Sequence, residues 1–222
     1  MTPDDFRALG HRMIDLVADY MRTVEDRPVT PSCAPGDLLH ALPAHPPERP
    51  EAWDDIFRDI DDLILPNLMH WQSPSFFGYF PCNASGPGIL GELLSAGLGV
   101  QGMLWSTSPA CTELEMRMLD WMADAIGLPP SFTFASPDGG GVIQGTASEA
   151  ALVALVAARH RHPGPEPVVY ASVDAHSSIR KAASIAGVRE VRAIATDETQ
   201  RLDPEALALA IREDRDAGRT PC

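Results

Sequence analysis

Residues 138–160 read DGGGVIQGTASEAALVALVAARH, and the architecture of the chain can be inferred outward from this segment. Three glycines lead into the apolar pair Val142-Ile143, which we expect to form a strand. A Gly-Thr-Ala-Ser turn follows, and a run of Ala, Leu and Val then predicts a helix over 146–161. Backbone N–H groups and hydroxyls at a helix start favour an anion, because the helix dipole is positive there. The segment indicates a phosphate-bearing ligand, and simple N-capping of the helix remains an equal alternative.

Strands and helices alternate after this segment. We expect strands at Val168–Ala171 and Val188–Ala195, and helices at 176–186 and 204–217. Such alternation indicates βαβ units, so the fold class is α/β with a mainly parallel sheet and flanking helices. The sequence ends at Cys222, where a further strand is expected to begin. We therefore expect an incomplete sheet and a truncated chain.

The sequence before this region predicts mostly helices. Thr2-Pro3-Asp4-Asp5 combines an N-cap residue, a proline and two acids, which is typical of a helix start. Apolar residues then recur at helical spacing up to Val24, so one helix face is a broad apolar stripe that needs a partner in this chain or another. Residues 27–50 are proline-rich and irregular. Further helices are expected at Gly36–Ala41, Glu51–Leu65, Pro87–Leu98 and Thr112–Ile126.

The composition excludes several classes of protein. The formal net charge is −14, which argues against nucleic acid and against an anionic membrane as partners, because both bind basic surfaces. Four scattered cysteines without a CxxC pair indicate a reducing, cytoplasmic compartment and no structural zinc. No His-x3-His or HExxH pattern occurs, so we expect no metal site. No apolar run approaches the roughly 20 residues of a membrane span.

Two further motifs hold candidate site residues. His176 follows a predicted strand and opens a helix, which places it at the carboxyl edge of the sheet, where ligands bind in such folds. Capping of its own helix is the alternative. The segment His70–Pro81, HWQSPSFFGYFP, holds five aromatic residues and is interrupted by proline and glycine, so we expect a loop. This loop forms either core packing or the wall of a pocket for a flat apolar ligand.

Four segments in this order resemble the aromatic-L-amino-acid decarboxylase family, the group II pyridoxal-phosphate-dependent decarboxylases. They are HWQSPSFFGYFP (70–81), SPACTELEMRMLDW (108–121), GGGVIQGTASEA (139–150) and DAHSSIRKA (174–182). The resemblance implies the fold type I PLP-dependent transferase-like architecture and a homodimer. Residues 1–85 would form an N-terminal helical arm for dimerisation, with the aromatic substrate loop at 70–82. Residues 86–222 would form the first part of the large PLP-binding domain.

The resemblance also implies the residues that bind the cofactor, pyridoxal 5'-phosphate. Ala147 and Ser148 would bind its phosphate, with Thr146 adjacent. His176 would stack on the pyridine ring close to the substrate and act as the catalytic residue of this chain.

A third group would contact the amino-acid substrate or the partner subunit. The implied lining of the substrate pocket is Trp71, Tyr79, Phe80, Pro81 and Cys82. Gln101 and Met103 would fall where the family presents apolar residues across the dimer interface. Cys82 stands where Thr or Ser is usual, so Cys82 and Gln101 leave the exact substrate open.

The implied activity is that of a carboxy-lyase of amino acid metabolism, which converts an aromatic L-amino acid to the amine and CO2. The family needs a Schiff-base lysine and an aspartate that pairs with the pyridinium nitrogen, both in later segments. Lys181 is the only lysine here, and it lies in a predicted helix where the family has no such lysine. We therefore expect this 222-residue chain alone to be inactive. Alternatives are an aldehyde synthase or another amino-acid decarboxylase of this fold, and a non-catalytic remnant that only dimerises.

Overall fold

A computed structural model describes residues 1–80 and 84–222. The chain divides into two compact units, Met1–Gly99 and Val100–Cys222, and each is described by itself. Pro81 and Cys82, two of the predicted substrate-binding residues, lie outside the described residues. The predicted division at residues 85 and 86 stays a prediction, because it concerns a dimerisation arm and a cofactor domain.

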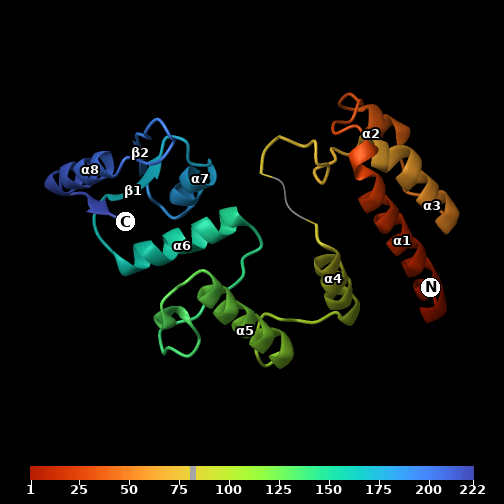
Figure 1. Ribbon diagram of the computed structural model, residues 1–222, viewed down its shortest axis with the longest axis horizontal. Helices are drawn as coiled ribbons and strands as arrows, with labels where there is room; N and C mark the ends of the chain where they lie inside the picture. The colour runs from red at the N-terminus through yellow and green to blue at the C-terminus, as the bar shows by residue number, and fades with distance from the viewer. Residues whose placement is uncertain (81–83) are drawn as a thin grey trace. The chain divides into compact units, whose positions relative to one another are not determined.

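The first unit is helical (Figure 1). Its helices are α1 (Pro3–Thr23), α2 (Asp37–Ala41), α3 (Trp53–Asp59) and α4 (Gly86–Leu98), with short 3-10 turns at Val24–Asp26 and Leu65–Asn67. The predicted start of α1 is confirmed, since the Thr2 hydroxyl accepts the Asp5 N–H and the Asp5 carboxylate accepts the Thr2 N–H. The helix predicted at Glu51–Leu65 begins at Trp53 and widens into a π-helical turn at Ile60–Ile64.

The contact between α1 and α3 is made by a few residues. The Arg12 guanidinium lies 4.0 Å from the centre of the Phe57 ring and forms an ion pair with Asp54. Phe57 itself is buried. No residue of α1 is buried, and Phe6 and Ile14 on its apolar stripe are exposed, so the described part of the chain leaves this stripe open.

The second unit is an α/β structure built on a parallel sheet. Its elements are α5 (Pro109–Ala125), a 3-10 turn at Pro130–Phe132, α6 (Ala147–Arg161), β1 (Pro167–Ser172), α7 (Ser178–Ile185), β2 (Glu190–Ile194), α8 (Pro204–Asp216) and β3 (Thr220–Pro221). The strand order is β2-β1-β3, and both pairings are parallel, with Val169 beside Val191 and Val168 beside Pro221. The predicted α/β class with a parallel sheet is confirmed, and the strand expected near the end of the sequence is β3.

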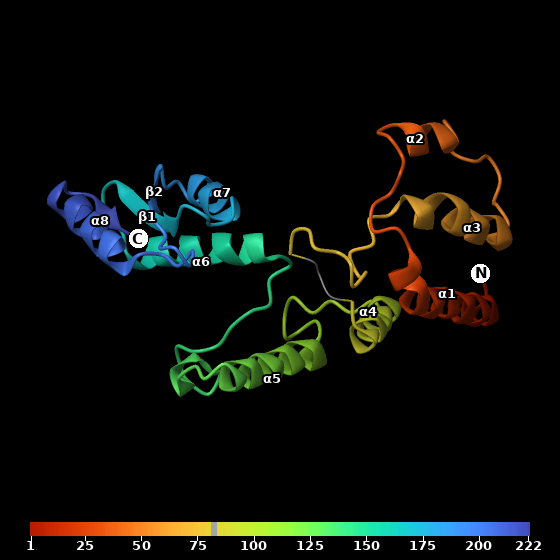
Figure 2. The same ribbon diagram turned by 45° about the horizontal axis from the view of Figure 1, so that its top comes forward.

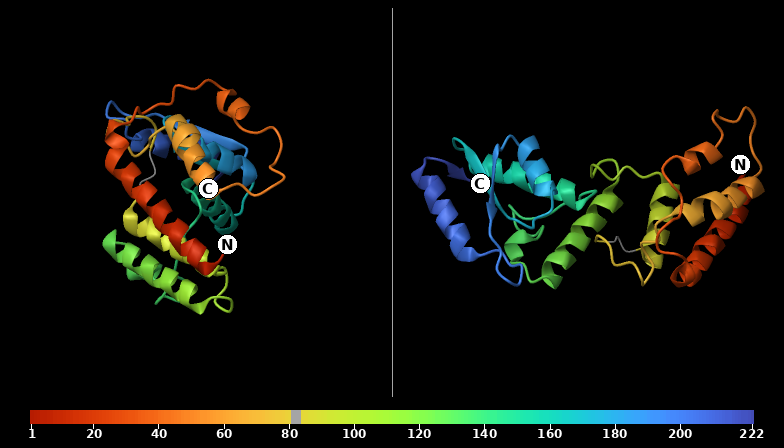
Figure 3. Two further views of the ribbon diagram at one scale, coloured as in Figure 1. Left: turned by 90° about the vertical axis from the view of Figure 1, so that its right-hand side faces the viewer. Right: turned by 90° about the horizontal axis from the view of Figure 1, so that it is seen from above.

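Helices cover both faces of this sheet. Val169 and Ala183 form a small core against which Leu155 of α6 and Ile179 of α7 pack. The opposite face carries Tyr170, whose hydroxyl reaches Asp214 on α8. The right-hand view of Figure 3 shows α8 on one side of the strands and α7 on the other, and Figure 2 shows α6 extending past the strands.

The predicted strand at Val142–Ile143 is wrong. Residues 141–144 pair with no strand among the described residues. The N–H of Ile143 donates instead to the Glu115 carboxylate of α5, at 2.9 Å. Two apolar residues can make few ladder hydrogen bonds, so one good side-chain acceptor suffices to hold this backbone in another path.

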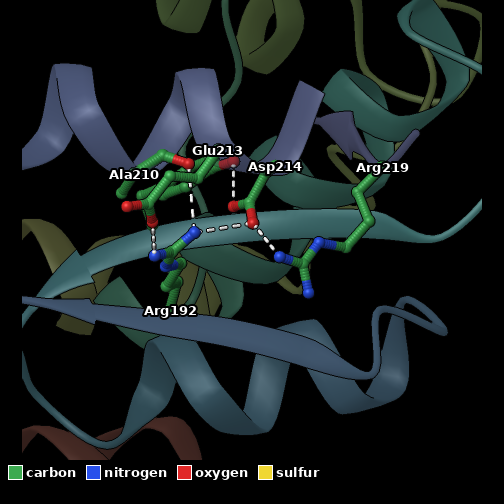
Figure 4. A network of polar contacts seen from close by, with 6 residues as sticks. Arg192, Ala210, Glu213, Asp214 and Arg219 are labelled. Atoms are coloured by element: carbon green, nitrogen blue, oxygen red, sulfur yellow. Dashed lines mark hydrogen bonds and ion pairs between the residues drawn. The ribbon is translucent and has the colours of Figure 1, made fainter. Parts of the chain in front are cut away.

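A buried polar cluster attaches α8 to the sheet (Figure 4). Asp214 is fully buried and accepts hydrogen bonds from the Tyr170 hydroxyl at 2.6 Å and from Arg192 Nη1 at 2.7 Å. Arg219 also pairs with Asp214, and Glu213 pairs with Arg192. Burial alone raises the pKa of Asp214, but the hydrogen bonds and the two guanidinium charges outweigh it and leave the pKa below its ordinary value. The same burial and the Asp214 carboxylate raise the pKa of Tyr170 to about 12.

Candidate functional site

The start of α6 closes on itself through two hydrogen bonds. The Thr146 hydroxyl accepts the Glu149 N–H at 3.1 Å, and the Glu149 carboxylate accepts the Gly145 N–H at 3.1 Å. The N-capping alternative is therefore present. It does not use the N–H groups of Ala147 and Ser148, because no acceptor among the described residues receives them. These two exposed first-turn donors lie where the helix dipole favours an anion.

The glycines before this helix serve the path of the backbone. A Cβ on Gly139 would lie 2.1 Å from the Thr133 carbonyl oxygen, so only glycine fits there. Gly140 has a φ of +117°, and its N–H donates to the Phe132 carbonyl at 3.0 Å. The glycine-rich segment thus folds back on residues 131–134, and its glycines shape the approach to α6.

His176 lies between β1 and α7, as predicted. Its Nδ1 accepts the Ser178 N–H at 3.2 Å and lies 3.0 Å from the Ser178 hydroxyl, so the imidazole caps the start of α7. With Nδ1 as acceptor, the neutral ring carries its proton on Nε2. The ring is exposed, so capping leaves its face accessible.

The topology brings His176 and the start of α6 to the same edge of the sheet. The chain enters β1 directly from α6, so the start of α6 lies at the carboxyl end of β1, and α7 begins from that end. Arg159 Nη1 donates to the Ala186 carbonyl at 2.6 Å, which joins the far ends of the two helices. Asp174 accepts the Thr196 hydroxyl at this edge, at 3.0 Å.

The aromatic loop is a stacked and exposed cluster. Trp71 stacks with Phe76 at 5.0 Å between ring centres and with Tyr79 at 5.7 Å. Tyr79 and Phe80 are 86% and 94% exposed, so these side chains belong to no core within the described residues. Tyr79 has a φ of +51°, a backbone conformation that side chains other than glycine rarely adopt. The exposure excludes core packing within the described residues, and the pocket-wall interpretation stays a prediction.

His70 anchors the base of this loop, a role that the sequence did not suggest. It is 2% exposed, and its ring Nδ1 lies 3.0 Å from the Tyr20 hydroxyl. Its backbone N–H donates to the Val29 carbonyl at 2.9 Å. Burial lowers the pKa of His70, and the positive charge of Arg27 lowers it further. Its partners lie about 40 and 50 residues away in sequence, so no local pattern could have revealed them.

The remaining candidates lie on the surface of the second unit. Met103 is exposed, and the Gln101 carbonyl accepts the Thr107 hydroxyl at 2.8 Å. Lys181 is exposed on α7. Within residues 1–80 and 84–222, no cluster of three or more His, Cys, Asp or Glu could hold a metal ion. No helix in the described part of the chain is long and apolar enough to cross a membrane.

The residues at this edge of the sheet fit a phosphorylated aromatic cofactor. Ala147 and Ser148 offer two unused N–H groups, and the Ser148 side chain adds a hydroxyl. An accessible imidazole from the next βα unit lies at the same edge, where a flat ring can stack on it.

Comparisons with known proteins identify the family. The sequence matches the family model described as the pyridoxal-dependent decarboxylase conserved domain over residues 35–222. Phenylacetaldehyde synthase of Arabidopsis thaliana is 47% identical over 232 residues, which cover 100% of this chain and 47% of the relative. Tryptophan decarboxylase 2 of Oryza sativa subsp. japonica is 45% identical, with 100% and 46% covered. The chain spans about half the length of the curated relatives it matches.

A solved structure shows the same fold. The crystal structure of Catharanthus roseus tryptophan decarboxylase in complex with L-tryptophan aligns with a TM-score of 0.93 at 39% identity. The alignment covers 100% of this chain and 50% of that chain. The two units described above therefore correspond to part of a fold type I structure.

Proposed function

The chain belongs to the pyridoxal-dependent decarboxylase family, and from this premise we propose that it provides the phosphate-binding site and the aromatic substrate loop of an aromatic-L-amino-acid decarboxylase. The proposed reaction releases CO2 from the amino acid and yields the amine. One observation carries the proposal: the unused N–H groups of Ala147 and Ser148 lie at the same sheet edge as the exposed His176 ring.

Each residue at this edge has a proposed task. Ala147 and Ser148 donate N–H groups to the cofactor phosphate, and Thr146 holds the helix start in place through its hydroxyl. His176 lies against the pyridine ring and fixes its plane. Pyridoxal 5'-phosphate, when bound, supplies the electron sink for the electron pair left when CO2 departs. The protein residues orient the cofactor and exclude water.

The aromatic loop is the proposed substrate wall. Trp71, Tyr79 and Phe80 present flat apolar rings, which suit an aromatic side chain better than the carboxylate of glutamate. Pro81 and Cys82 are proposed to complete this wall on the resemblance alone. The names of the two plant relatives support an aromatic substrate.

An aldehyde synthase is the second candidate, because a relative with this name is 47% identical. Product analysis with aromatic amino acids separates the two activities. A decarboxylase releases the amine and CO2, whereas an aldehyde synthase releases the aldehyde, ammonia and hydrogen peroxide.

We also propose a homodimer in the cytoplasm, in which residues 1–85 form the arm that packs on the partner subunit. The open apolar stripe of α1 supports this arrangement. Met103 and Gln101 are proposed to lie near the subunit contact, and the second domain is proposed to begin at residue 86.

Titration of the 222-residue chain with pyridoxal 5'-phosphate tests the proposed phosphate-binding site. Ala147 is the first residue of α6, where proline fits a helix well, so Ala147→Pro removes one N–H donor and keeps the helix start. We expect its affinity for the cofactor to fall about tenfold, as for loss of one hydrogen bond to a charged group. Unchanged affinity with an unchanged circular dichroism spectrum would contradict the proposed phosphate-binding site.

A test of Lys181 shows whether this chain alone holds the lysine that a decarboxylase of this family needs. We propose that Lys181 forms no bond with the cofactor and that the 222-residue chain alone has no decarboxylase activity. An absorption band with the cofactor that disappears in Lys181→Ala would overturn this. The non-catalytic remnant is the remaining alternative, and a reading frame that continues beyond Cys222 into a lysine-bearing segment would exclude it.

A further inference from the structure

Three residues of α5 contact the chain before, within and after the glycines. Glu115 Oε1 accepts the Ile143 N–H, and Asp120 Oδ1 accepts the Phe134 N–H, each at 2.9 Å. Between them, the methyl groups of Leu119 lie 3.6 and 3.8 Å from the position of a Cβ on Gly141. Glu115 and Leu119 are four residues apart and share one helix face, whereas Asp120 lies on the adjoining side of the helix. A single helix thus holds the chain on both sides of the glycines, at Phe134 and at Ile143.

These contacts replace the sheet pairing that the sequence predicted. The N–H groups of Gly139 and Gly140 bond to carbonyls of the preceding turn. Beyond Gly140, Glu115 supplies the acceptor for Ile143. The segment between the glycines and α6 therefore takes its path from α5 side chains.

Several N–H groups around the start of α6 have no acceptor among the described residues. They are those of Gln144 and Thr146 before the helix and those of Ala147 and Ser148 in its first turn. The N–H of Ile143 bonds to Glu115, the N–H of Gly145 bonds to Glu149, and the N–H of Glu149 bonds to the Thr146 hydroxyl. The amides of Ala147 and Ser148 follow this fixed backbone directly and have no acceptor among the described residues. Their direction is set by a backbone that Glu115 holds four residues before Ala147.

We propose that Glu115 and Asp120 are positioning residues that fix the glycine-rich segment and so aim the Ala147 and Ser148 amides at one anion. The inference rests on the proposed function, which makes that anion the cofactor phosphate. A carboxylate close to a bound phosphate repels it. Glu115 therefore aids binding through its acceptor oxygen and not through its charge. Asp120 has a further partner in Arg117, at 4.0 Å.

The test separates the acceptor from the charge in the 222-residue chain. Glu115→Ala removes both, whereas Glu115→Gln keeps an acceptor oxygen and removes only the charge; Asp120→Ala and Asp120→Asn form the matching pair. Asp124→Ala is the control, because this acid is exposed on the same helix. The measurements are amide hydrogen exchange at Phe134 and Ile143 and the dissociation constant of pyridoxal 5'-phosphate.

We expect faster exchange at Ile143 in Glu115→Ala and at Phe134 in Asp120→Ala, with cofactor affinity about fivefold weaker in each. Glu115→Gln and Asp120→Asn should restore slow exchange and bind at least as well as the unaltered chain, and Asp124→Ala should change neither quantity. Equal affinity in both alanine variants and the unaltered chain would overturn the inference alone. If the unaltered chain leaves the cofactor unbound, the proposed function fails and the inference fails with it.

Discussion

Asp214 is the central side chain of the polar cluster that attaches α8 to the sheet. It is fully buried between two guanidinium groups and the Tyr170 hydroxyl. Because its pKa lies below the ordinary value, its contribution to stability is present at neutral pH and is lost as pH falls through the folded-state pKa.

Asp214→Ala should destabilise the second unit by about 3 kcal/mol, because it leaves Arg192 and Arg219 without their shared carboxylate. The value lies at the lower end for broken buried pairs, since both arginines keep some contact with water. Urea unfolding followed by circular dichroism measures the change. Asp216→Ala, an exposed acid on the same helix, should stay within about 0.5 kcal/mol, and equal losses in both variants would contradict the prediction.

His70 gives the first unit a predicted dependence on pH. Burial lowers its pKa in the folded state, so the unfolded chain binds the proton more readily. The free energy of unfolding should therefore fall as pH drops below about 6.5, the ordinary histidine value, and the fall should end below the folded-state pKa.

Unfolding at pH 8 and at pH 5.5 tests this dependence. His70→Asn should weaken it, whereas His45→Asn, a change at an exposed histidine, should leave it as it is. A dependence that persists unchanged in His70→Asn would show that another group causes it.

The sequence predicted where the candidate residues of the sheet edge lie, but it did not predict the long-range hydrogen bonds that hold the fold around them. His176 and the start of α6 follow local signals, a strand end and a helix start, which a short window contains. Tyr20 and His70 are far apart in the sequence, as are Tyr170 and Asp214. Pairs of this kind depend on the tertiary fold, so no pattern in the sequence could have predicted them.

The glycine-rich segment shows how a loop can be specified by what surrounds it. A Cβ on Gly139 would meet the Thr133 carbonyl at 2.1 Å, whereas a Cβ on Gly141 would meet only Leu119 side-chain atoms at 3.6 Å. The first contact involves backbone and is impossible without movement; the second is ordinary van der Waals contact.

Gly139→Ala should therefore destabilise the second unit by about 2 kcal/mol or more, and Gly141→Ala by less than about 1 kcal/mol. Thermal unfolding of the two variants side by side gives the comparison. Similar melting temperatures would mean that the segment relaxes freely, and the fixed path argued for α5 and the glycines would be wrong.

Helices were predicted well because their caps and periodicity are local. Thr2, Thr146 and Asp203 each cap a helix close to its predicted start. The strand predicted at Val142–Ile143 failed because an apolar pair is compatible with several backbone paths, and α5 supplied a hydrogen-bond acceptor that the local sequence does not contain.

The chain as a whole carries more apolar surface than its own described residues cover. The stripe on α1 continues into an apolar groove between α1, α3 and α4, lined among others by Phe6, Ile14, Trp53 and Leu90. The sequence predicted the stripe correctly, but periodicity identifies only the face that needs cover and not the surface that provides it.

The proposed homodimer makes a prediction about this groove. The chain should sediment as a dimer, and Ile14→Asp should shift it toward the monomer, because a carboxylate in a closed apolar interface loses its hydration without gaining a partner. Ala8→Asp adds the same charge at an exposed position of α1 outside the groove lining, so it should leave the dimer intact. Analytical ultracentrifugation over a range of concentrations distinguishes the two. A monomeric unaltered chain, or equal dissociation in both variants, would remove the α1 stripe from the subunit contact.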